Sequence, residues 1–141
     1  MFRLAMYKGR GNLFNAFIRF WDGGIYSHCE LVFSNGISAS ASYRDGQKVR
    51  AKVIEFDDEH WDFVELPSFM EGAALKFLKD TEGKGYDLIG QLRFIAAPLR
   101  GQRNKYWCSE WVAAALGMKD PWRYGPNGLY AAIAASKETN E

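Results

Sequence analysis

Alternating hydrophobic and polar residues predict a group of β-strands in the first half of the chain. Asn35-Gly36 is typical of the turn of a β-hairpin, and Asp45-Gly46 marks a second turn. Pro67 closes the last of these segments before the pattern changes. The segments predicted as strands are 26–33, 37–42, 48–56 and 61–66.

Helical spacing of apolar residues follows Pro67. It predicts helices over 70–81, 86–97 and 108–116, and a short Ala-rich helix further on. An earlier segment, 13–21, has the same spacing and ends at Asp22-Gly23-Gly24. Strands followed by helices are typical of an α+β domain. We therefore expect one domain over 1–141, in which an antiparallel meander of about four or more strands packs against helices.

The composition is typical of a soluble globular protein. Of the 141 residues, 48% are hydrophobic and 25% are charged, and the formal net charge is +1. A chain so close to neutral has no net field to attract nucleic acid or anionic lipid, so we expect neither as a partner. No segment approaches the ~20 apolar residues of a membrane span, and the first residues lack the apolar stretch of a signal peptide. A cytoplasmic location is expected, and the sequence does not predict the oligomeric state.

Neither a metal nor a cofactor is expected. The chain has two cysteines and two histidines, and their positions fit no zinc-binding pattern. The glycine-rich segment KGRGN lacks the Lys-Ser/Thr pair that a phosphate-binding loop needs.

Cys108 is the candidate nucleophile. It stands where the 108–116 helix is predicted to begin, and a helix N-terminus together with an imidazole lowers a thiol pKa from about 8.5 to roughly 3.5–7.5. His28, on a predicted strand, is the candidate base. The alternative is a buried helix, YWCSEWVAAAL, whose cysteine only packs. Spacing alone does not decide between the two.

Cys29 is expected to be structural. Because successive side chains of a strand point to opposite faces, His28 and Cys29 are not expected to reach the same site. Cys29 shares its face with Leu31 and Phe33, which is typical of a small core residue.

Four segments carry a resemblance to a known family. In this order, YSHCELVF, SASYRDG, GKGYDLIG and YWCSEWVAAAL resemble the circularly permuted branch of the NlpC-type papain-like superfamily, over roughly residues 17–130. That branch includes lecithin:retinol acyltransferase-like proteins and small bacterial and phage hydrolases, and its histidine strand precedes its cysteine helix. The resemblance implies a permuted papain-like fold, with Cys108 as the nucleophile and His28 as the general base.

The residue that orients His28 is left open between two candidates. Relatives commonly carry a His or Glu on the next strand, and Ser40 takes that position by spacing. Glu30 is the other candidate, because it shares the face of His28 two residues along the same strand. Its carboxylate could instead pair with an arginine such as Arg44 or Arg50. The resemblance also suggests a set of residues for the substrate-binding cleft: Tyr26, Trp21, Tyr86, Asp87 and Trp107.

The sequence therefore predicts a cysteine peptidase or amidase that cleaves an amide bond through a thioacyl-enzyme. Cell-wall peptides and isopeptides are the substrates that the resemblance implies, and delivery by lysis or a virion would fit a phage-encoded enzyme. Two alternatives stay open: an acyltransferase acting on lipid or amine acceptors, and a catalytically silent binding module of the same fold.

Overall fold

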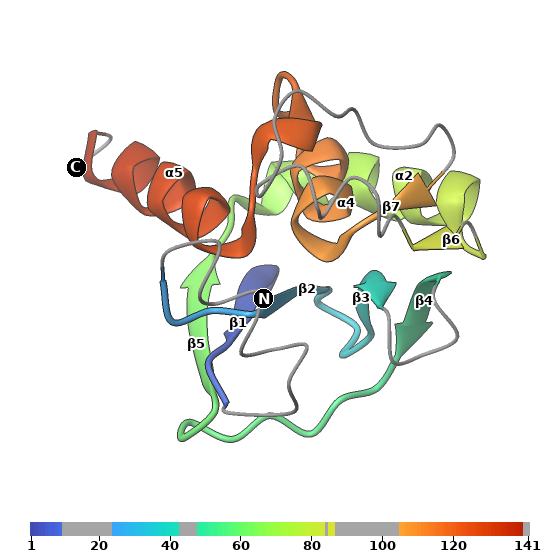
Figure 1. Cartoon of the computed structure of the whole chain (residues 1–141). Coiled ribbons are helices and arrows are strands. Elements are labelled where there is room, and N and C mark those ends of the chain that lie inside the picture. Colours follow the sequence, from blue (N-terminus) through green and yellow to red (C-terminus); the bar gives the residue numbers. More distant parts are fainter. Residues whose placement is uncertain (10–23, 43–47, 84, 87–104, 140–141) are drawn as a thin grey trace.

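Helices cover one face of an antiparallel sheet in the computed structural model of the chain (Figure 1). The structure describes residues 1–9, 24–42, 48–83, 85–86 and 105–139. Five strands lie in the order β5-β1-β2-β3-β4, and each is antiparallel to its neighbours. Their bounds are Arg3–Tyr7 (β1), His28–Val32 (β2), Ser38–Ser42 (β3), Lys48–Lys52 (β4) and Trp61–Glu65 (β5). The predicted α+β class and antiparallel sheet are confirmed.

The hairpin between β2 and β3 forms where the Asn-Gly signal predicts it. Gly36 has a φ of 87°, a left-handed conformation that glycine adopts without steric cost. The Ile37 backbone N–H donates to the Asn35 side-chain oxygen at 2.9 Å, and the Phe33 N–H donates to the Ile37 carbonyl at 2.8 Å. These bonds close the turn and set the register of the two strands.

Strand β1 corrects the predicted meander. The sequence patterns did not predict a strand at residues 3–7, yet β1 lies between β2 and β5. The segment 61–66 was expected to follow β4 in the sheet, but β5 crosses to the far side and pairs with β1. Leu4 and Met6 of β1 are fully buried, so burial of these side chains accounts for the place of β1 between two other strands.

Two short strands lie beyond β4 and correct one helix prediction. Strand β6, Gly85–Tyr86, pairs with β4, and β7, Lys105–Tyr106, runs parallel to β6. Tyr86 therefore belongs to a strand and not to the start of a helix over 86–97. Residues 87–97 and the helix predicted over 13–21 lie outside the described residues.

The described helices agree with the remaining predictions to within a few residues. Helix α2 spans Glu71–Thr81 after a 3-10 turn, and α4 spans Cys108–Ala115. Helix α5, Pro126–Thr139, is longer than expected and begins inside a stretch that looked irregular. None of the helices within the described ranges is long and apolar enough to cross a membrane.

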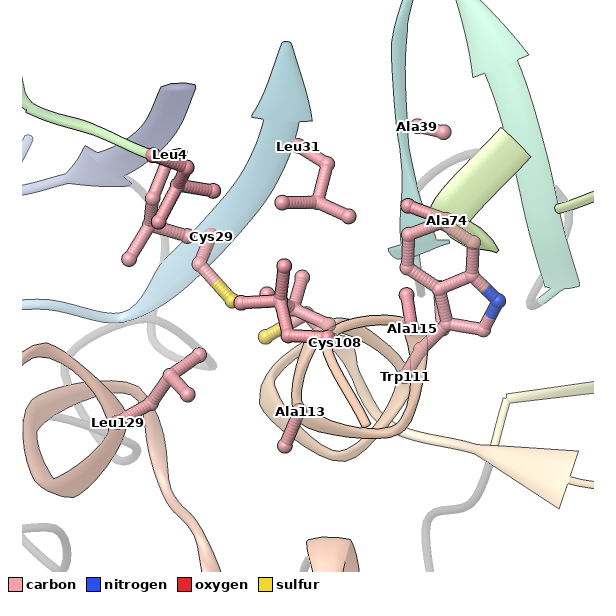
Figure 2. Close-up of a cluster of buried hydrophobic side chains, with 14 of the residues drawn as sticks. Leu4, Cys29, Leu31, Ala39, Ala74, Cys108, Trp111, Ala113, Ala115 and Leu129 are labelled. Carbon is pink, nitrogen blue, oxygen red and sulfur yellow. The ribbon is translucent and has the colours of Figure 1, made fainter. Parts of the chain in front are cut away.

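The hydrophobic core lies between the sheet and the helices. Helix α4 packs on β2 and β3, and its Trp111 is fully buried (Figure 2). The Trp111 indole N–H donates to the Thr81 hydroxyl at 2.8 Å, which ties α4 to the end of α2. Cys29 and Cys108 both lie in this core, on facing elements. The core thus holds the start of α4 against β2.

Candidate active site

The start of α4 is fixed by hydrogen bonds on both sides of Cys108. The Trp107 indole N–H donates to the Tyr124 carbonyl at 2.9 Å, and the Ser109 hydroxyl donates to the same carbonyl at 2.7 Å. Trp107 itself has an extended backbone, and α4 begins at the next residue. Cys108 is therefore the first residue of a helix, where backbone N–H groups have no partner within the helix and the helix dipole favours negative charge.

A buried carboxylate holds His28 on β2. The His28 Nε2 atom lies 2.9 Å from one oxygen of Glu30, and the other oxygen accepts a hydrogen bond from the Arg50 guanidinium. Glu30 has no exposed side-chain surface, and the Arg50 side chain is 10% exposed. Two cationic groups thus balance one buried carboxylate, and the imidazole is fixed through its Nε2 atom.

Cys108 contacts both His28 and Cys29. Its sulfur makes hydrogen bonds with the side chains of both residues, and Figure 2 shows Cys29 and Cys108 pointing toward each other. The expectation that His28 and Cys29 address different sites is therefore wrong. Alternation separates side chains across the body of a sheet, but His28 is the first residue of β2, and β2 pairs with β3 only at Leu31 and Val32. Among the described residues no β3 residue is paired beside His28, and the His28 side chain contacts Cys108.

The pKa of the Cys108 thiol is held well below its ordinary value. The hydrogen bond with the Cys29 side chain lowers it most, and burial of the sulfur acts in the opposite direction. The charge of His28 and the hydrogen bond with it lower the pKa further. The thiolate is consequently the favoured form of Cys108.

The pKa of His28 is raised to about 9, and that of Glu30 is lowered. Burial is the largest influence on each, and it favours the neutral forms. The charges of Cys108 and then Glu30 outweigh it at His28, while His28 and then Arg50 outweigh it at Glu30. Together the pKa shifts favour a thiolate, an imidazolium and a carboxylate in one chain of contacts.

Access to this chain of contacts is restricted. Cys108 is 1% exposed and Cys29 is fully buried, whereas 22% of the His28 side-chain surface is exposed. A large substrate therefore reaches the sulfur only after a rearrangement that uncovers it. Of the residues in this chain of contacts, His28 has the most exposed side chain.

The other predicted site residues lie in different surroundings. Ser40 is fully buried, and its hydroxyl donates to the Ala41 carbonyl at 3.4 Å without bonding to His28 in the described structure. Tyr26 is 6% exposed and donates to Asp62 at 2.5 Å, and burial together with this bond raises its pKa. Trp107 has no exposed surface. Trp21, Asp87 and the side chain of Tyr86 lie outside the described part of the structure.

The sequence analysis did not predict the contacts that two residues near the site make. Cys29 contacts the candidate nucleophile, although strand alternation placed it elsewhere. Asn127 of α5 bonds both the N–H and the carbonyl of Tyr26, each at 2.9 Å, and so fixes the segment that leads into β2. No local pattern indicates this role of Asn127, because its partner lies 101 residues away in the chain.

Within the described ranges, no three His, Cys, Asp or Glu residues are placed to hold a metal ion.

No family model, curated protein or solved structure matches the chain. The geometry around Cys108 is therefore what bears on function.

Proposed function

We propose that the chain is a cysteine hydrolase of amide or peptide bonds, with Cys108 as the nucleophile, His28 as the acid and base, and Glu30 as the residue that orients His28. One observation carries the proposal: a cysteine at the first position of a helix contacts a histidine that a buried carboxylate holds in place. Covalent catalysis generally uses a nucleophile that contacts a base, and the base is in turn oriented by a third group.

In the proposed reaction, the Cys108 thiolate attacks the substrate carbonyl carbon, forming a carbon–sulfur bond while the carbonyl electron pair moves to oxygen. The His28 imidazolium then gives its proton to the leaving amine as the carbon–nitrogen bond breaks. Neutral His28 next takes a proton from water, whose oxygen attacks the thioester and releases the acid and the thiolate. Glu30 keeps the ring in the orientation that both proton transfers need, because its oxygen lies 2.9 Å from His28 Nε2.

The helix start supports the negative charge that develops in this reaction. The backbone N–H of Cys108 belongs to the first turn of α4, where no carbonyl within the helix accepts it. A well-placed donor of this kind stabilises an oxyanion by about 2.7–4 kcal/mol in known enzymes. Glu110, in the same turn, is 6% exposed and suits the positive end of the helix dipole, a structural role.

The order of the elements supports assignment to the circularly permuted branch of the NlpC-type papain-like superfamily. The histidine strand, β2, precedes the cysteine helix, α4, and the two pack together. Under this proposal the substrate is a cell-wall peptide, an isopeptide or another acyl compound, and the enzyme is phage-encoded or bacterial.

The burial of Cys108 favours one rival reading, a binding module of the same fold without turnover. A sulfur that is 1% exposed cannot accept an acyl group from a large substrate in the conformation described. The hydrolase therefore requires an opening motion, whereas the binding module does not.

Trapping the acyl-enzyme separates these readings. The chain would be mixed with a small thioester, quenched in acid and analysed by mass spectrometry after proteolysis. The hydrolase predicts one acyl group on Cys108, none in Cys108→Ala, and acylation that persists in Cys29→Ala as the matched control. Release into water alone supports the hydrolase, and preferential transfer to an added amine or lipid supports the acyltransferase. If no acyl group is found on Cys108, or if it is found on Cys29, the proposed role of Cys108 is wrong.

A further inference from the structure

The geometry points to Cys29 as a resolving thiol for Cys108: on reaction with a hydroperoxide, the two sulfurs join in an intramolecular disulfide that reversibly blocks the candidate nucleophile. This inference concerns a modification of the site and requires no turnover of an amide substrate.

The two cysteine sulfurs of the core lie in contact with each other. Cys29 and Cys108 are the only cysteines of the chain, 79 positions apart, yet they face each other across the contact between β2 and α4 (Figure 2). Neither cysteine is in a disulfide, both are buried, and their side chains share a hydrogen bond. In the proposed hydrolysis Cys29 serves only as a hydrogen-bond partner that favours the Cys108 thiolate, and the reactivity of the Cys29 thiol itself has no part in that reaction.

The surroundings favour reaction within the pair. Apolar side chains, including Leu4, Leu31 and Leu129, surround the two sulfurs in Figure 2. A buried sulfur is out of reach of a large thiol or a second protein chain, whereas a hydroperoxide is small. Once Cys108 is oxidised, the nearest thiol is therefore Cys29. Forming an S–S bond of about 2.05 Å requires the two sulfurs to move from a hydrogen-bond distance to a bonding distance.

The chemistry balances with a hydroperoxide as the oxidant. The Cys108 thiolate attacks one peroxide oxygen, the O–O bond breaks, and the leaving hydroxide or alkoxide takes the proton of the His28 imidazolium. This step gives Cys108 sulfenic acid and water or an alcohol. The Cys29 sulfur then attacks the Cys108 sulfur, an S–S bond forms, and hydroxide leaves with the Cys29 proton as water. The two thiols together lose two electrons, which the peroxide accepts.

A disulfide formed in this way is reversible in a reducing compartment. A small thiol breaks an S–S bond by exchange once it reaches one of the two sulfurs. Oxidation past sulfenic acid is instead irreversible for most cysteines. A resolving Cys29 would therefore protect the candidate nucleophile from permanent loss.

Peptide mapping of the full chain tests this inference. The reduced protein, freed of reductant, is treated with hydrogen peroxide near neutral pH and then alkylated in denaturant. We expect a mass loss of about 2 Da, loss of both free thiols, a cross-linked peptide that joins Cys29 and Cys108, and full reversal by dithiothreitol. In Cys29→Ala and Cys29→Ser, whose folding is checked by thermal denaturation, Cys108 should gain about 16 Da as a dimedone-reactive sulfenic acid.

Three results would overturn the inference. They are stable sulfenic or sulfinic acid on Cys108 of the unchanged chain, a disulfide between two chains, and no oxidation of either thiol under excess peroxide. The mapping is independent of acyl transfer. A chain that forms the cross-link but accepts no acyl group contradicts the proposed hydrolase alone, and a chain that is acylated without cross-linking contradicts the resolving role alone.

Discussion

The carboxylate of Glu30 lies 2.9 Å from His28 Nε2 at a position with no exposed surface. A charge buried so completely is costly unless it is paired, and here it is paired with both His28 and Arg50. The sequence left open whether Glu30 serves the histidine or an arginine, and it contacts both.

Replacing Glu30 by Gln tests its role in orienting His28. The change keeps the size of the side chain and removes its charge, so the pKa of His28 should fall from about 9 toward 6.5. We expect kcat/KM in acyl transfer to decrease by about 10²-fold, the lower end of the range for general acid–base catalysis, with little change in KM. Histidine NMR titration and steady-state kinetics measure the two effects. Ser40→Ala is the matched comparison, and an equal loss in that variant would contradict the assignment of Glu30.

Arg50 should contribute to stability through Glu30. Arg50→Met leaves the buried carboxylate with His28 alone, and removing one partner of a buried ion pair typically costs about 3–5 kcal/mol in the free energy of unfolding. Combining Arg50→Met with Glu30→Gln should recover part of that loss, because no unbalanced carboxylate is left. Urea denaturation of the two single variants and the double variant provides the test. A cost below about 1 kcal/mol for Arg50→Met would be typical of an exposed pair and would contradict this account.

The Cys108–His28 pair predicts an unusual dependence of stability on pH. Taken alone, a raised pKa at His28 contributes stability that is lost as pH rises through about 9, and a lowered pKa at Cys108 contributes stability that is lost as pH falls. The unfolded pair binds one proton between 6.5, the value for histidine, and 9.0, the value for cysteine. The folded pair binds one proton between the lowered pKa of Cys108 and about 9, so both pairs bind one proton where these two ranges overlap. The two effects therefore cancel in this window, and the pair's contribution should be constant there.

Below pH 6.5 the unfolded imidazole takes up a second proton, so the contribution should decrease as the pH falls. The measurement is the difference in free energy of unfolding between the unchanged chain and the double variant Cys108→Ala/His28→Ala from pH 5 to 9. A slope of about 1.4 kcal/mol per pH unit inside the window would mean that only one member of the pair changes its protonation on folding.

Asn127 and Gly24 should be coupled in stability. Asn127→Ala removes both hydrogen bonds to the Tyr26 backbone and should cost about 1–3 kcal/mol. Gly24→Ala places a Cβ atom 2.2 Å from the Asn127 side-chain oxygen, so it should also be destabilising. In the double variant the clash is absent. The loss in the free energy of unfolding of the double variant should therefore be well below the sum of the losses in the two single variants. Strict additivity of the two costs in urea denaturation would show that this contact is not formed.

Local patterns in the sequence predicted local structure. The β2–β3 hairpin follows from Asn35-Gly36, and helices α2 and α4 follow from apolar spacing, because each depends on residues close in the chain. The place of β1 between β2 and β5, and the crossing of β5, depend on pairing between distant segments, which short-range patterns do not encode.

In the candidate site, too, local features could be predicted and contacts between distant segments could not. Cys108 at the start of a helix could be predicted from the chain alone, whereas its contact with Cys29 could not, because the alternation rule says nothing about the position of a helix relative to the end of a strand. Arg50 and Glu30 come together through the order of β2, β3 and β4, which the sequence suggested only as one of several pairings.

Titration of the Cys108 thiolate tests the central claim most directly. The measurement is the thiolate ultraviolet absorbance of the folded chain across pH, with that of Cys108→Ser subtracted and His28→Gln measured in parallel. The account predicts that the thiolate of the unchanged chain appears well below pH 9.0, and that its appearance shifts to higher pH in His28→Gln. A thiolate that appears only near pH 9.0, the ordinary value for cysteine, and does so equally with and without His28, would contradict it.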